Sequence, residues 1–173
     1  DDLQKDNSDA VWIFTDGARV EGRPREKCAG AYIISWLRDP TEASTIASGA
    51  SRAGLACAYS AEIGTIDDAL EYVLDNFEKV FAGKQCKELV LVTDSKSSLE
   101  SMRTTWLRKI QQREQRACRH LHDLAARDVF ITLAFVFSHV GGCEGNAMAD
   151  ELAEQMCEKY GTECPKQGIW HVD

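Results

Sequence analysis

Apolar residues gather along the chain in short runs that predict five β-strands. The first run, AVWIFTD, is rich in β-forming residues and ends in Asp-Gly, which is a turn signal. The run VFITLAFVF is the longest apolar stretch and is typical of a buried strand. The predicted strands lie at 10–16, 29–36, 45–50, 88–95 and 129–138.

Apolar residues at three- and four-residue steps predict helices between and after these strands. Ile63, Ile66 and Leu70 share one face of a predicted helix over 60–83, which Gly83 ends. The further predicted helices lie at 97–106, 104–128 and 147–160.

The predicted elements follow the order β-β-β-α-β-α-α-β-α, which is typical of an α/β fold with a mixed sheet and helices packed on it. The length of 173 residues suits one domain. We expect an N-terminal tail over 1–8, the domain over 9–160 and a C-terminal extension over 161–173. No apolar run approaches the ~18 residues of a membrane span. Because the chain opens with Asp rather than Met, we expect an excised domain or a processed product.

The net charge of −8 argues against a nucleic-acid partner, whose binding depends on phosphate neutralisation by Lys and Arg. The distribution of charge changes this picture, because residues 101–120 hold six Lys or Arg and one Glu. This basic run is either the solvated face of a helix or a surface for nucleic acid. In the second case the candidate phosphate-binding residues are Arg103, Arg108, Lys109, Arg113 and Arg116.

The chain has seven cysteines, and no two of them form a Cys-x-x-Cys pair. An odd number without paired spacing favours reduced thiols and argues against a zinc site. We therefore expect an intracellular protein, with nucleus and cytoplasm left open.

Four acids stand where predicted strands end or predicted helices begin. Asp16 and Asp94 end two strands, and Glu62 and Asp150 lie in the first turns of two helices. Each acid on its own is typical of a turn, a cap or a favourable charge at a helix N-terminus. The four acids as a set suggest more than each one alone. A small mixed sheet brings adjacent strand ends together, and helices cross its face. We therefore expect the four carboxylates to converge.

Converging carboxylates repel one another unless cations lie between them. Ligands made only of oxygen favour hard ions, so the candidate cofactor is Mg²⁺ or Mn²⁺. Two such ions about 3.5–4 Å apart are the apparatus of in-line phosphodiester cleavage. The acids therefore suggest a nuclease.

Four motifs resemble those of the type 1 ribonuclease H family, in the family's order. They are FTDG, YSAEI, LVTDS and SHVGxxxGNxxADELA, and the resemblance covers roughly residues 9–158. The SHVG form and the segment TDSKSSLESM are most similar to the ribonuclease H domains of non-LTR retrotransposons, which accompany a reverse transcriptase. The resemblance implies a ribonuclease H-like fold: a mixed five-stranded sheet with helices packed on both faces.

The resemblance also implies a metal-dependent endoribonuclease that cuts the RNA strand of RNA–DNA hybrids and leaves 5′-phosphate and 3′-hydroxyl ends. The residues that would bind two Mg²⁺ ions, with Mn²⁺ as a substitute, are Asp16, Glu62, Asp94 and Asp150. His139 would lie on a mobile loop and assist proton transfer and product release, a task that suits its unperturbed pKa of ~6.5. Asn146, as an N-cap, would begin the helix that presents Asp150.

Two features depart from the family pattern. His139 precedes Asp150 by eleven residues, one more than is usual in the family. The Asn-Pro-Gly that often follows the first acid, and helps to read RNA 2′-hydroxyls, is replaced here by the segment GARVEGRPREKCAG. Two other functions therefore stay open: a nuclease for DNA or structured RNA, and a non-catalytic binding or scaffolding module in a nucleic-acid assembly.

The partners implied by the resemblance are an RNA–DNA hybrid and a reverse transcriptase joined covalently in a parent protein. We expect no membrane association and a domain that is monomeric.

Overall fold

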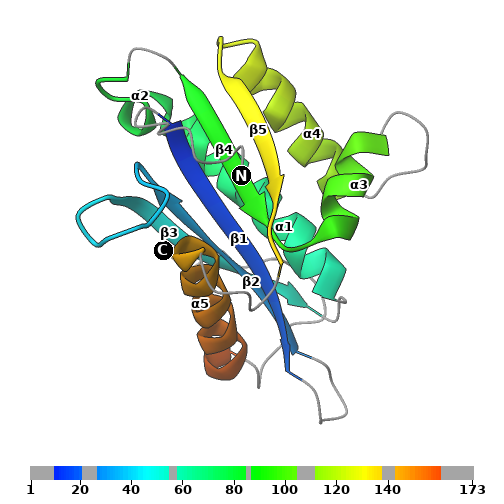
Figure 1. Cartoon of the computed structure of the whole chain (residues 1–173). Coiled ribbons are helices and arrows are strands. Elements are labelled where there is room, and N and C mark those ends of the chain that lie inside the picture. Colours follow the sequence, from blue (N-terminus) through cyan, green and yellow to red (C-terminus); the bar gives the residue numbers. More distant parts are fainter. Residues whose placement is uncertain are drawn as a thin grey trace.

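The computed structural model describes residues 10–20, 27–54, 58–84, 87–104, 112–137 and 143–160. They form a five-stranded sheet, in the order β3-β2-β1-β4-β5, with helices on both faces (Figure 1). The elements are β1 (Ala10–Val20), β2 (Lys27–Ser35), β3 (Thr45–Gly54), α1 (Ala58–Asp75), α2 (Phe77–Val80), β4 (Glu88–Thr93), α3 (Lys96–Thr104), α4 (Gln112–Ala125), β5 (Phe130–Phe135) and α5 (Glu144–Tyr160). The predicted α/β class and element order are confirmed, with the short α2 added. The predicted tail and C-terminal extension lie outside the described residues.

The sheet is mixed, as predicted. β1 pairs antiparallel with β2 and parallel with β4, and β4 pairs parallel with β5. Thr15 of β1 lies opposite Thr93, the last residue of β4. Asp16 and Asp94, the residues that follow this pair, are therefore neighbours at one end of the sheet.

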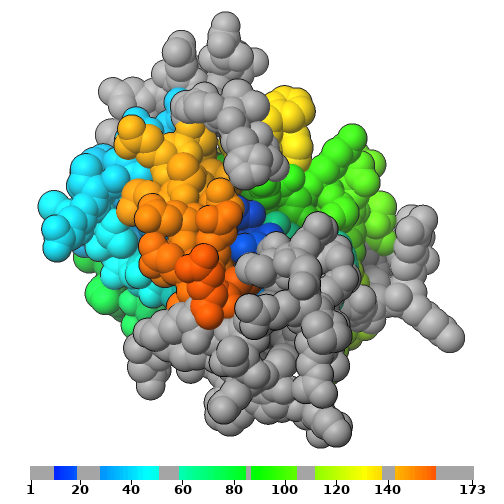
Figure 2. Space-filling view, turned by 90° about the horizontal axis from the view of Figure 1, so that it is seen from below, coloured from blue at the N-terminus to red at the C-terminus, as the bar shows by residue number. Residues whose placement is uncertain are grey.

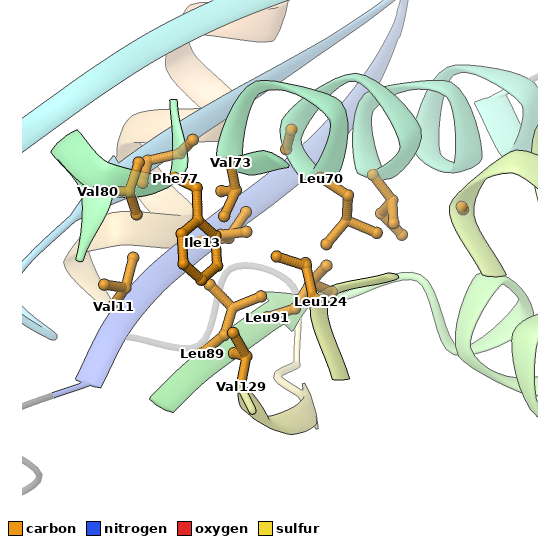
Figure 3. Packing of buried hydrophobic residues seen from close by; sticks show 14 of the residues in the cluster. Val11, Ile13, Leu70, Val73, Phe77, Val80, Leu89, Leu91, Leu124 and Val129 are labelled. Carbon is orange, nitrogen blue, oxygen red and sulfur yellow. The ribbon is translucent and has the colours of Figure 1, made fainter. Parts of the chain in front are cut away.

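Side chains alternate along β1 and divide the core between the two faces of the sheet. Val11 and Ile13 point to one face, where they pack with Leu70 of α1 and Leu124 of α4 (Figure 3). Phe14 points to the other face and packs in a cluster with Ala149 of α5. The two helical layers therefore hold β1 from both sides, close to the position of Asp16.

Helix α5 begins at Glu144, earlier than the predicted 147. The Ala147 amide donates to the Cys143 carbonyl at 3.2 Å, so Asn146 lies inside the first turn and the predicted N-cap was wrong. A Cβ on Gly145 would lie 2.4 Å from the Phe14 ring. Glycine therefore allows this early turn to lie directly on the sheet.

Strand β1 continues through Asp16 and Gly17 to Val20, so the predicted turn at Asp-Gly was also wrong. Gly17 pairs with Gly30 of β2, which shows that the ladder runs on without interruption. Asp16 consequently lies within a strand, and the residue before it, Thr15, pairs with β2 on one side and with β4 on the other.

The predicted strand over 129–138 is present as β5, but the prediction that it is buried was wrong. β5 is an edge strand, and Phe130 and Phe137 are 70% and 72% exposed. Within β5, Ala134 is the one buried residue, and it packs in the cluster of Phe14 and Ala149, whereas α5 contacts chiefly β1, β2 and β3.

Two chemical features of the described residues bear on expectations from the sequence. No disulfide joins the described cysteines, which are Cys28, Cys118, Cys143 and Cys157. Within the described ranges, no helix has the length and apolar character needed to cross a membrane.

Candidate active site

Three of the predicted acids meet at one end of the sheet. Asp16 comes from β1, Glu62 from α1 and Asp94 from the residue after β4, and one carboxylate oxygen of each lies within 4.8 Å of the others. The parallel pairing of β1 with β4 brings the two Asp together, and α1 crosses the sheet with Glu62 in its second turn. The convergence expected from the sequence is therefore present for these three residues.

Asp150 completes the group from the other face of the sheet. Its carboxyl hydrogen-bonds with that of Asp16, and its negative charge adds to the repulsion there. Asp150 is not one of the three acids that share the compact oxygen cluster. Asp150 of α5 therefore lies beside Asp16, next to the cluster that Asp16 forms with Glu62 and Asp94.

Gly17 fixes two of these acids through its backbone. Its amide donates to Oε1 of Glu62 at 2.9 Å and to Oδ1 of Asp16 at 2.7 Å. A Cβ on Gly17 would lie 2.9 Å from Cδ and Oε1 of Glu62. Glycine is needed here because the Glu62 carboxylate approaches the backbone more closely than any side chain would allow.

Burial and mutual repulsion raise the pKa values of the clustered acids. Burial, followed by the charge of Asp94, raises the pKa of Asp16 to about 7. Burial, followed by the charge of Asp16, raises the pKa of Glu62 to about 9. Asp16 and Glu62 therefore retain protons near neutral pH unless positive charge is supplied.

The donor set fits a hard divalent cation. All of the converging atoms are carboxylate oxygens, which are the ligands that Mg²⁺ and Mn²⁺ favour. Oε2 of Glu62 is buried, and no described residue donates a hydrogen bond to it from an amide, a hydroxyl or a basic group. A bound cation would satisfy that oxygen and relieve the repulsion that raises both pKa values.

The surface at this end of the molecule leaves part of the central strand accessible. Figure 2 shows blue atoms of β1 between orange α5 and the green segment that contains β4 and α3. This is the combination of elements that carries Asp16, Asp94 and Asp150.

A sequence model of the RNase H family matches residues 8–158. The chain belongs to the RNase H family. The resemblance to type 1 enzymes and the predicted enzyme class, ribonuclease H, are thereby confirmed. A search among curated proteins gave no match.

Solved structures with the same fold include several RNases H. RNase H1 from the archaeon Halobacterium salinarum NRC-1 is 19% identical, with a TM-score of 0.58 over 86% of this chain and 98% of that one. LC11-RNase H1 in complex with an RNA/DNA hybrid is 18% identical, with a TM-score of 0.58 over 88% and 99%. The prototype foamy virus protease-reverse transcriptase is 17% identical, with a TM-score of 0.59 over 84% of this chain and 20% of that one.

Not every predicted site residue of this RNase H lies in the described structure. His139, Arg108 and Lys109 fall outside the described residues. Arg103 is exposed near the end of α3, the helix that follows Asp94. Its predicted contact with phosphate stays a prediction.

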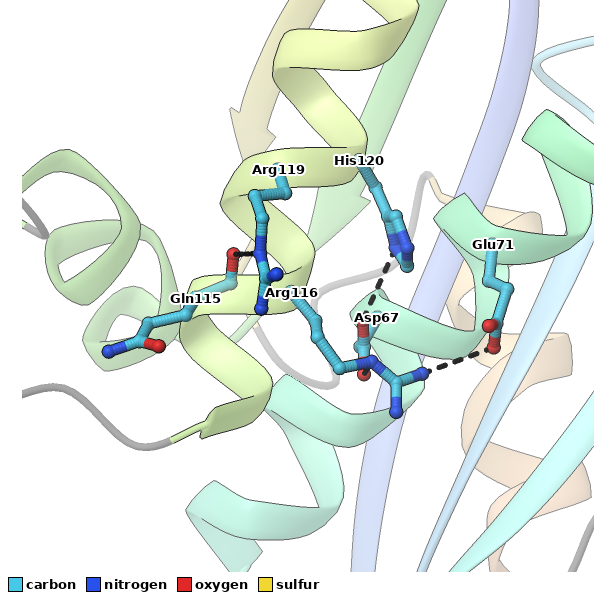
Figure 4. Close-up of polar contacts among 6 residues, drawn as sticks. All are labelled: Asp67, Glu71, Gln115, Arg116, Arg119 and His120. Carbon is cyan, nitrogen blue, oxygen red and sulfur yellow. Dashed lines mark hydrogen bonds and ion pairs between the residues drawn. The ribbon is translucent and has the colours of Figure 1, made fainter.

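Arg113 and Arg116 lie where α4 packs against α1. Arg116 forms ion pairs with Asp67 and Glu71, both at 3.2 Å (Figure 4). A Cβ on Gly64 of α1 would lie 1.8 Å from the Arg113 guanidinium. Their proposed role with nucleic acid stays a prediction, but the structure gives both residues a contact inside the protein.

Sequence reasoning missed this polar interface between helices. Asp67 is fully buried and also lies 3.3 Å from Nδ1 of His120 on α4. The signal was available in the sequence, because Asp67 and Glu71 are four residues apart on the predicted helix, opposite a helix rich in Arg. A basic stripe along one helix and an acidic stripe along another predict a helix pair as readily as they predict a ligand.

Proposed function

We propose that this RNase H is a metal-dependent endoribonuclease that hydrolyses the RNA strand of RNA–DNA hybrids. The observation that carries the proposal is the cluster of buried Asp16 and Glu62 with half-buried Asp94, and with Asp150 beside it, in a member of this family. Such a cluster does not stabilise the metal-free fold, because burial and mutual repulsion raise the pKa values of Asp16 and Glu62.

The four acids would hold two Mg²⁺ ions, with Mn²⁺ as a substitute. Bound ions supply a water of lowered pKa and stabilise charge on the attacking and departing oxygens. The chain's own part is to hold the ligands still, and the Gly17 amide does this for Glu62 and Asp16. His139 is proposed to move a proton near the departing group.

The proposed substrate and setting draw support from the structural neighbours. LC11-RNase H1 was solved with an RNA/DNA hybrid, and the foamy virus neighbour joins its similar region to a protease and a reverse transcriptase. We infer that this chain acts on a hybrid, that its parent protein includes a reverse transcriptase of retrotransposon type, and that it works inside the cell as a monomeric domain.

The experiment is cleavage of a labelled RNA–DNA hybrid in Mg²⁺, in Mn²⁺ and in EDTA. Cutting of the RNA strand that requires metal and is lost in Asp94→Asn supports the proposal. Asp123→Asn removes an exposed acid on α4 and is the matched control, with cleavage expected at the wild-type rate.

Duplex RNA and duplex DNA belong in the same experiment. Preferential cutting of either duplex would show that the protein is a nuclease with a substrate other than the proposed hybrid. Hybrid binding without cutting, in a folded protein with metal present, would favour the non-catalytic module instead.

A further inference from the structure

A buried glutamate of α4 joins the helix that carries Glu62 to the helix that follows Asp94. Glu114 is 6% exposed. Its Oε1 accepts hydrogen bonds from the Tyr59 hydroxyl of α1 and, at 2.8 Å, from the Ser101 hydroxyl of α3. One carboxylate oxygen therefore connects three helices.

The two helices that Glu114 holds are those that position Glu62 and Asp94. Tyr59 lies three residues before Glu62, on the same side of the first turns of α1. Helix α3 starts two residues after Asp94, and the Lys96 amide donates to the Asp94 carbonyl at 3.2 Å. A shift of either helix relative to α4 would change the separation of the two acids.

The position of this contact distinguishes it from ordinary helix packing. Helices α1 and α4 are also linked further along by the ion pairs of Asp67 with Arg116 and His120 (Figure 4). The contact at Glu114 lies at the start of α1, three residues from Glu62. Small displacements matter there, because Mg²⁺ requires near-ideal octahedral geometry and metal sites tolerate about 0.5 Å of error.

We propose that Glu114 is a positioning residue that sets the separation of Glu62 and Asp94 and thereby the affinity of the acid cluster for divalent metal. This inference rests on the proposed metal-dependent function. Glu114 acts through Tyr59 on α1 and through Ser101 on α3.

The test is the metal affinity of Glu114→Ala, measured by calorimetric titration with Mg²⁺ and Mn²⁺ and by the metal dependence of hybrid cleavage. Removing a group that is hydrogen-bonded directly to a metal ligand typically lowers metal affinity about 10–100-fold. Because Glu114 acts through another residue, we expect the dissociation constant to rise roughly threefold to tenfold. Glu114→Gln keeps an oxygen acceptor and should restore affinity to within about twofold of wild type.

The matched control is Asp67→Asn, which weakens the second link between the same two helices. It should lower the melting temperature and leave metal affinity unchanged. If Glu114→Ala does not fold, Tyr59→Phe decides the question, because it removes only the hydroxyl that Glu114 holds. Tyr59→Phe should weaken metal binding in the same direction.

If Glu114→Ala folds and binds metal with wild-type affinity, the proposal is overturned. If Glu114→Ala does not fold, wild-type metal affinity in Tyr59→Phe overturns it. An equal loss of affinity in Asp67→Asn would also overturn it, because the effect would then follow general stability. A wild-type protein that binds metal without cutting hybrid would defeat the proposed function, and the calorimetric comparison would still decide the role of Glu114. A wild-type protein that binds no divalent metal would overturn both.

Discussion

At the scale of single residues, the closeness of Gly17 to Glu62 is the most restrictive feature of the site. No unusual backbone conformation is involved, since Gly17 continues the β1 ladder opposite Gly30. The restriction is steric, because a Cβ would lie 2.9 Å from the Glu62 carboxylate. We therefore predict that Gly17→Ala displaces Glu62 and lowers hybrid cleavage by at least ~10-fold, as expected for a disturbed metal ligand.

The control for this prediction is Gly83→Ala. Gly83 has a φ of +73° with no atom within 4 Å of an added Cβ, so its substitution strains the backbone far from the acids. It should cost about 1 kcal/mol of stability and leave cleavage unchanged. Cleavage rates and thermal melts of both variants check the pair, and full activity in Gly17→Ala would contradict the steric argument.

The raised pKa values predict how the metal-free protein responds to pH. The pKa values of Asp16 and Glu62 rise from 3.8 and 4.5 to about 7 and about 9 on folding. The folded state then binds more protons than the unfolded state, so stability falls as pH rises from about 4 to about 9. Melting temperature in EDTA should decrease across this range.

Added Mg²⁺ should restore the stability that is lost at high pH, because a cation replaces the protons between the acids. Burial raises the pKa of Asp67 to about 6, so Asp67 also lowers stability as pH rises. Mg²⁺ should not reverse this second loss of stability. Thermal melts at pH 5 and pH 8.5, each with EDTA and with Mg²⁺, separate the two contributions. Equal effects of Mg²⁺ at both pH values would contradict the raised pKa values of Asp16 and Glu62.

At the scale of elements, the packing of α4 on α1 depends on a buried acid. Asp67 is fully buried between Arg116 and His120, and Arg116 is 35% exposed. Removing one partner of a fully buried pair costs about 3–5 kcal/mol, and partial exposure of Arg116 reduces that figure. We predict that Asp67→Ala destabilises the protein by roughly 2 kcal/mol in urea unfolding at pH 7. A loss below about 0.5 kcal/mol, the range of ordinary surface substitutions, would count against the ion pairs.

The elements also show how far the sequence could predict this structure. The five strands and the convergence of Asp16, Glu62 and Asp94 followed from apolar periodicity and strand order. The exposure of β5 did not, because an apolar run such as VFITLAFVF carries no information on whether a helix covers it. The pairing of Arg116 with Asp67 was missed for a related reason: a charged stripe identifies a polar surface without identifying its partner.

At the scale of the whole molecule, a net charge of −8 must be reconciled with a polyanionic substrate. Hybrid binding then has to rest on local positive charge, and the described structure divides the candidate residues into two kinds. Arg103 is exposed on α3, whereas Arg116 is paired with Asp67 and Glu71. The two arginines should therefore respond differently to the same substitution.

We predict that Arg103→Gln weakens hybrid binding and lowers the slope of log affinity against log salt by about 1, the loss of one phosphate contact. Arg116→Gln should instead lower the melting temperature and leave that slope unchanged, because its charge is already neutralised by α1. Binding isotherms at several salt concentrations, beside thermal melts, measure both effects. An equal reduction of the slope in the two variants would show that Arg116 contacts the substrate in spite of its ion pairs. The basic residues of α4 would then be part of the nucleic-acid-binding surface.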